Sequence, residues 1–148
     1  MDFDVDTLPD EFSQKLFAGS LPVLDDKENA VRLHLFAAGF RELFTHILNS
    51  YASEEEVRAC SWFVQAEDTP TVTRRQRAIY ATQGGLADEF VGKLGLDIHE
   101  LHKAAIKAID KLSAATHVRE GQVVSDEGEI TEFVANALAS LGGLPCIV

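Results

Sequence analysis

Apolar residues recur at helical spacing along most of the chain, and the longest such stretch runs from Val31 to Tyr51. An apolar residue at every third or fourth position predicts one helix of about six turns. Its apolar stripe is broad, which is typical of the central rod of a helical bundle. We expect this helix to begin after Asp25 and Asp26, because acidic side chains stabilise the free N–H groups and the positive dipole end of a helix.

Two shorter helices are expected on either side of this rod in the sequence. One covers about residues 10–18 and ends at Gly19. The other follows a capping box, in which the Ser53 hydroxyl accepts from a free N–H group and Glu56 reaches back. This second helix is expected to reach the polar stretch 67–70. The first six residues show no steady pattern, and we expect disorder to be confined to them.

The next helix is expected to begin at Thr73 or Thr71, either of which can serve as its cap, and to end at Leu94. The adjacent glycines Gly84 and Gly85 interrupt it. Each glycine costs roughly 1 kcal/mol in a helix interior. We therefore expect a kink, or a close contact with another helix, at this pair.

Gly95 is expected to end that helix and Asp97 to cap another one. The apolar stripe of this helix consists of Ile98, Leu101, Ala105, Ile106, Ile109 and Leu112. Lysines lie between these positions, at Lys103, Lys107 and Lys111. The pattern is strongly amphipathic and predicts a helix with one buried face.

A loop through Gly121 is expected to follow, with a short extended stretch at residues 123–124. Ser125 or Asp126 then caps a last helix, which ends at Gly142. No internal repeat is visible. The sequence therefore predicts a helical segment in almost every part of the chain.

Together these elements predict an all-α fold: a single-domain bundle of five to six helices in a chain of 148 residues. Short connections favour antiparallel packing of neighbouring helices. We expect residues 1–24 to form an N-terminal tail with a short helix, residues 25–142 the bundle domain, and residues 143–148 a C-terminal tail.

The charge and composition narrow the classes of partner. The formal net charge is −11, from 24 acidic and 13 basic residues. Such a charge disfavours nucleic acid as a partner, because phosphate binding depends on dense cations. A local basic patch would be needed for it. The chain shows no membrane-length apolar run and no secretory signal, so no membrane contact and a cytoplasmic location are expected. Cys60 and Cys146 are then expected to be reduced thiols.

The segment from Lys111 to His117 closes the fifth predicted helix and is the first candidate site. A cation followed by a histidine is similar to the loose motif of HEPN ribonucleases, which has arginine in place of the lysine. In such a site the histidine acts as acid and base on a 2′-hydroxyl while the cation stabilises phosphate charge. The structural alternative is that His117 and Arg119 offset the dipole of the helix C-terminus.

Arg41 and His46 fit the same loose motif on the central helix. A five-residue offset in a regular helix separates the two side chains by about 140° around the axis. A role on the helix surface is therefore favoured for this pair over catalysis. Arg41 remains a candidate for contact with phosphate or a partner.

The densest positive cluster is Arg74, Arg75 and Arg77, at a predicted helix start where the dipole disfavours cations. Such a cluster indicates either an acidic partner or phosphate, or salt bridges to the acidic run 54–56. No metal site is expected: His99 and His102 share one helix face, but no matching third and fourth ligands accompany them. No cofactor is expected either.

Three segments together resemble one known family: Arg41-Glu42-Leu43-Phe44, Thr73-Arg74-Arg75-Gln76-Arg77, and Leu112-Ser113 with Thr116-His117-Val118-Arg119. In order and spacing they resemble the helical region of the predicted pPIWI-associating nucleases, over roughly residues 28–142. The resemblance implies a bacterial protein of anti-phage conflict systems with a HEPN-like fold. Longer members of the family carry further sequence beyond the helical region.

Two functions follow from these observations. The first, which we favour, is a helical interaction or regulatory module of a bacterial defence system that binds a protein partner or forms a homodimer. The alternative is a metal-independent HEPN-like ribonuclease, with His117 as acid and base and with Lys111, Arg119 and Arg74 on the phosphate. The acidic charge and the lysine in place of arginine count against the alternative.

Overall fold

A computed structural model of the chain describes residues 3–94 and 98–144, and for residues 98–102 it describes the backbone only. Seven α-helices are present in these ranges: α1 (Glu11–Ser20), α2 (Arg32–Tyr51), α3 (Glu54–Arg58), α4 (Arg74–Gln83), α5 (Asp88–Lys93), α6 (Ile98–Thr116) and α7 (Glu127–Gly142). Two 3-10 turns, Val5–Thr7 and Pro22–Asp25, flank α1. The described residues contain no strand, so the predicted all-α class is confirmed. None of the described helices is long and apolar enough to cross a membrane.

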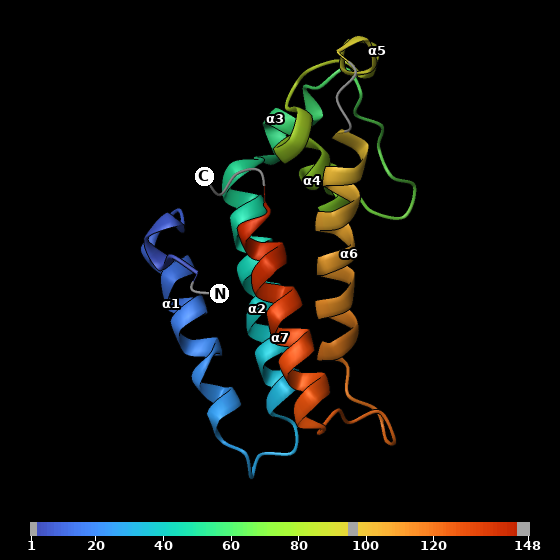
Figure 1. The fold of residues 1–148 in the computed structure, drawn as a ribbon. Helices are drawn as coiled ribbons and strands as arrows, with labels where there is room; N and C mark the ends of the chain where they lie inside the picture. Colours follow the sequence, from blue (N-terminus) through green and yellow to red (C-terminus); the bar gives the residue numbers. More distant parts are fainter. Residues whose placement is uncertain (1–2, 95–97, 145–148) are drawn as a thin grey trace.

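The central element of the bundle is α2. It contacts α1, α4, α6 and α7 (Figure 1), so neighbours surround it. Its buried apolar side chains are Leu33, Phe36, Ala37, Phe40, Leu43, Phe44, Ile47 and Leu48. The predicted central rod is therefore confirmed, and burial of this broad stripe is the main source of stability.

The helices α1 and α2 lie very close to each other at Gly39. A Cβ atom at this position would lie 2.0 Å from Ser20 Oγ and 3.0 Å from Ser20 Cβ. Ser20 is itself buried, and its hydroxyl donates to the Leu16 carbonyl at 2.6 Å. Only glycine therefore allows this separation of the two helices.

We expect Gly39→Ala to destabilise the fold by up to about 2 kcal/mol. The clash with Ser20 costs about 1–3 kcal/mol, and the better helix propensity of alanine offsets roughly 1 kcal/mol of it. Urea denaturation measures the effect. The matched control is Gly19→Ala, where an added Cβ meets nothing within 4 Å. In a Ser20→Gly background the cost should vanish; a cost that persists there would contradict this account.

The start of α2 lies later than predicted. The helix begins at Arg32, and Asp25 instead ends a 3-10 turn. That turn starts with Pro22, and the Asn29 side chain then accepts from the Val31 N–H at 3.0 Å. Asp25 and Asp26 therefore belong to the end of the 3-10 turn, and they do not cap α2.

The short helix α3 is also shorter than predicted. Ser53 caps it as expected, by accepting from the Glu56 N–H, but the helix ends at Arg58. Beyond it the Arg58 guanidinium donates to Glu54 and to the Pro70 carbonyl. The chain there forms a second small core, which contains Ala52, Val57, Trp62, Phe63, Val72 and Tyr80. Packing into this cluster replaces the helix that was expected to reach residues 67–70.

The predicted kink at the glycine pair is a complete break. Thr73 caps α4 through a capping box with Gln76, but α4 ends before Gly84, whose φ is +58°. The Gly84 carbonyl accepts the Trp62 indole N–H at 2.9 Å. Nothing lies within 4 Å of a Cβ at either glycine, so no close helix contact explains the pair. The break raises the number of helices above the predicted five to six.

Two smaller predictions concern residues 123–124 and the N-terminus. Residues 123–124 belong to no regular element, and the Val124 N–H donates to the His34 ring. Near the N-terminus Val5–Thr7 form a 3-10 turn, and the Phe3 ring packs on Phe17 at 5.2 Å. Asp126 caps α7 as one of the two predicted residues. The predicted roles of Gly95 and Asp97 lie outside the described residues.

Candidate functional site

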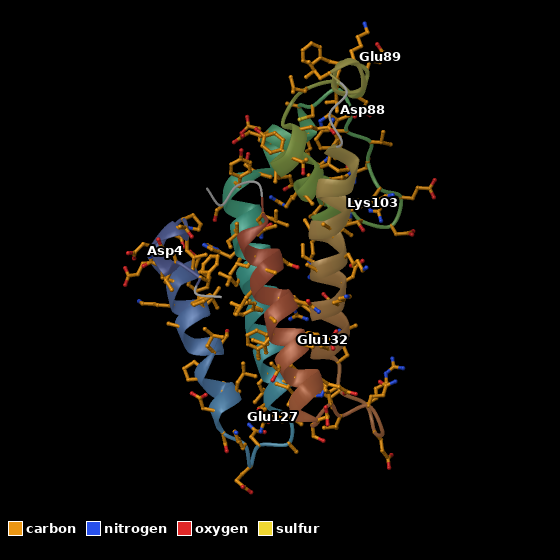
Figure 2. The ribbon with its side chains drawn as sticks, viewed as in Figure 1. Asp4, Asp88, Glu89, Lys103, Glu127 and Glu132 are labelled. Carbon is orange, nitrogen blue, oxygen red and sulfur yellow. The ribbon has the colours of Figure 1, made fainter. Side chains whose placement is uncertain are left out.

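Basic side chains of two helices gather on one side of the bundle. We call the set Arg74, Arg75, Lys103, Lys107 and Lys111 the cationic face; Arg74 and Arg75 open α4 and the lysines lie on α6. Residues four apart on a helix share one side of it, so the lysines form a row. All five side chains are exposed. Figure 2 shows Lys103 on the side of α6 away from α1.

A groove of about 550 Å³ runs along this face, and we call it the α4–α6 groove. Its lining combines four basic side chains with apolar ones and one acid: Arg75, Lys103, Ile106, Lys107, Asp110, Lys111 and Ala114. A neighbouring hollow of about 480 Å³ includes Arg74 and Arg75 next to Ile109 and Asp110. In a protein of net charge −11, this is a local concentration of positive charge that attracts anionic groups.

The start of α4 holds the arginines toward α6. The Thr73–Gln76 capping box fixes the first turn, and from it Arg74 Nη1 reaches Ser113 Oγ on α6 at 3.3 Å. Arg77 points elsewhere and donates to the Ala52 carbonyl at the end of α2. Arg77 therefore joins helices together and does not line the groove.

Salt bridges to the acidic run 54–56 do not account for Arg74 and Arg75. Glu54 pairs with Arg58 at 3.0 Å, and this hydrogen bond is the main cause that lowers the Glu54 pKa. The charge of Arg77 adds to that lowering of the pKa. Within the described residues neither Arg74 nor Arg75 forms an ion pair, so their charges face solvent and the two hollows.

Lys111 lies on the cationic face, whereas His117 lies in the loop after α6. The helix α6 is regular through Thr116, and His117 lies just beyond its end. If the helical geometry continued, an offset of six residues would place the two side chains about 120° apart around the axis and about 9 Å apart along it. His117 and Arg119 are both exposed in the following loop and do not line the α4–α6 groove. In the described part of the chain neither side chain makes a hydrogen bond or an ion pair.

Arg41 and His46 are likewise separate. Arg41 pairs with its neighbour Glu42 at 2.9 Å, whereas His46 Nε2 lies 2.7 Å from Asp10 Oδ2 at the cap of α1. The His46 ring also packs edge-on against Phe12. The backbone N–H of Ser13 and then His46 lower the Asp10 pKa. His46 thus ties α1 to α2. It does not meet Arg41, as the rotation between the two positions suggested.

The sequence reasoning missed His34, the buried histidine of α2. Its Nε2 accepts the Val124 N–H at 3.1 Å, so Nδ1 carries the proton and donates to the Ala115 carbonyl at 2.7 Å. This ring therefore joins α2 to the end of α6 and to the loop before α7. Next to it Arg32 pairs with Glu127 of α7 at 2.5 Å. These contacts hold the loop that carries His117.

The small core contains no activated nucleophile. Tyr80 donates to Glu56 at 2.6 Å, and this hydrogen bond raises the Tyr80 pKa to about 12. Burial, and then the charge of Glu56, raise the pKa of the Cys60 thiol. Both groups therefore stay protonated at neutral pH. Cys60 is unpaired, and Cys146 and the side chains of His99 and His102 lie outside the described residues.

Comparison with known proteins gives one result. A family model described as "Predicted pPIWI-associating nuclease" matches residues 6–141. No curated protein and no solved structure matches the chain. The match covers α1 through almost all of α7, including the cationic face and the His117 loop. The chain belongs to the family of predicted pPIWI-associating nucleases.

Proposed function

We propose that this protein is a helical interaction module of a bacterial defence system, acts in the cytoplasm and binds an anionic partner through its cationic face. The observation that carries the proposal is the α4–α6 groove. Arg75, Lys103, Lys107 and Lys111 line it together, on an otherwise acidic protein. Charge of this kind steers association and selects partners of opposite sign.

A second candidate is the metal-independent ribonuclease. Its support is that His117 and Arg119 are both exposed and two residues apart in one loop. A histidine there can act as acid and base only if a cation reaches the same phosphate. Lys111 lies about 120° away around the axis of α6, so Arg119 of the same loop would have to supply the cation. The interaction module does not depend on such an arrangement, and we favour it.

The experiment is co-purification of the tagged protein with the products of its neighbouring genes, co-expressed one at a time. Arg75→Glu/Lys103→Glu should abolish the complex while circular dichroism stays unchanged. The matched control is Lys27→Glu/Lys93→Glu, which changes the net charge equally at exposed positions outside the groove. A complex that survives the first pair of reversals, or a protein that binds none of these products and does not dimerise, would refute the proposal.

The ribonuclease is tested in parallel. Wild type and His117→Ala are incubated with single-stranded RNA without divalent metal. Cleavage by wild type that His117→Ala abolishes, with helicity retained, would establish the second candidate. If the wild type cleaves no RNA, either as a monomer or as an oligomer, the ribonuclease hypothesis is wrong.

A further inference from the structure

The lysine row has a second groove on its other side, between α6 and α7, with a volume of about 350 Å³. Its floor is apolar and mostly small: Ala104, Ala108, Ala137 and the half-buried ring of Phe133. Lys107 and Lys111 form one rim. We call this hollow the α6–α7 groove.

The opposite rim is polar without charge, since Asn136 and Ser140 of α7 form it. The groove therefore has a defined cross-section: cations on one side, an apolar floor, and neutral hydrogen-bonding groups on the other side. Such a section matches an amphipathic segment that carries negative charge along one edge only.

We propose that the α6–α7 groove binds an acidic amphipathic helix of a protein partner, an inference that rests on the proposed interaction function and names the partner's chemistry. Small side chains such as Ala104 and Ala108 allow another helix to approach closely, as the usual 8–10 Å between packed axes requires. Lys107 and Lys111 are one turn apart. Carboxylates four residues apart on the partner repeat at the same interval of about 6 Å, so two pairs form in register.

The two lysine charges are available for this contact. Within the described residues Lys107 and Lys111 form no ion pair. Like charges four residues apart destabilise a helix slightly, and carboxylates bound between them would remove that repulsion. Charge complementarity therefore favours an acidic occupant over a neutral one.

The walls of the groove are held in place without any partner. Arg32 pairs with Glu127 at the start of α7, and His34 accepts from Val124 and donates to Ala115 at the end of α6. Both helices are thus anchored to α2 at the same end of the bundle. A preformed groove lowers the ordering cost of binding.

A nucleic-acid strand fits this groove less well. Single-stranded binders combine cations with exposed aromatic rings on which bases stack. The aromatic ring of this groove, Phe133, is half-buried and packs edge-on against Phe36 at a centroid distance of 6.4 Å. An apolar floor also offers no cation or hydrogen-bond donor to a phosphate backbone, and the net charge of −11 repels that backbone.

The test uses a designed, fluorescently labelled peptide helix with glutamates at every fourth position and leucines on the adjacent edge. Fluorescence anisotropy with the full chain should show saturable binding. Lys107→Glu/Lys111→Glu should raise Kd at least about tenfold. Ala104→Leu, which fills the floor but keeps charge and helicity, should also raise Kd severalfold. Lys27→Glu/Lys93→Glu should leave Kd unchanged.

Three outcomes would overturn the inference: no binding of the peptide, equal binding of a scrambled peptide of the same composition, or displacement of the peptide by poly-uridine RNA at lower concentration. Failure here is distinguishable from failure of the proposed function. If the complex with a neighbouring gene product depends on Arg75 and Lys103 while the peptide does not bind, the interaction function stands and this occupant is wrong.

Discussion

Phe40→Ala is expected to destabilise the protein by about 3–5 kcal/mol, the largest effect of any substitution considered. Phe40 is 0% exposed in the middle of α2. Its ring lies 4.3 Å from that of Phe36 and 5.8 Å from that of Phe17 on α1, measured between centroids. Truncation removes apolar burial and leaves a cavity that the surrounding helices can fill only in part.

Equilibrium urea denaturation checks this prediction. Small domains have a total stability of about 5–15 kcal/mol, so the variant should unfold at a much lower urea concentration or be unfolded without urea. Phe90→Ala is the matched control, since this ring on α5 is 48% exposed. It should cost less than about 1 kcal/mol. Equal losses for the two substitutions would mean that α2 is not the central element of the core.

The second large effect is expected for His34→Ala, at about 2–4 kcal/mol. The substitution leaves the Ala115 carbonyl and the Val124 N–H without their partner, and each unsatisfied group in a part-buried position costs about 1–3 kcal/mol. Water that enters the space left by the ring can hydrogen-bond to these groups, so the total cost stays below the sum of the two upper values. Thermal unfolding followed by circular dichroism gives the change in Tm.

The control for this substitution is the same change at His117, in the loop after α6. The His117 side chain is exposed and makes no hydrogen bond within the described residues. His117→Ala should therefore change stability by less than about 0.5 kcal/mol. A stability loss for His117→Ala as large as that for His34→Ala would show that the loop is held by His117, and the contacts of His34 would then explain little.

The sequence predicted the long helices well, because their signal is repeated over many turns. The apolar stripe of α2 and the amphipathic pattern of α6 each extend over several turns, so no single residue decides them. The caps Ser53, Thr73 and Asp126 were readable for a different reason: each accepts from an N–H group three residues on, a contact that is local in sequence.

The break at Gly84 was only half predicted. Adjacent glycines showed that the helix is weakened, but not whether it bends or ends. The outcome depends on Trp62, which donates to the Gly84 carbonyl from 22 positions earlier. The early end of α3 has a similar cause, since Trp62 and Phe63 pack into a core that forms only when distant segments meet. Local propensity contains no information about such contacts.

The candidate site likewise has features that local spacing predicts and features that depend on packing between distant segments. The row Lys103, Lys107 and Lys111 was visible as a one-turn spacing, but its approach to Arg75 of another helix depends on how α4 packs against α6. The importance of His34 was invisible, because its partners are 81 and 90 positions away. The catalytic roles proposed for Lys111 and His117 remain predictions, because they concern contacts with RNA and not the packing of the chain.

The indole of Trp62 has a further consequence, because it is the only tryptophan of the chain. It belongs to the small core beside the α4–α5 break, whereas the phenylalanines of α2 belong to the main one. Intrinsic emission therefore reports on one end of the molecule, while far-ultraviolet dichroism reports on the whole bundle. Superposition of the two unfolding curves is thus a direct measure of whether both cores melt as one cooperative unit.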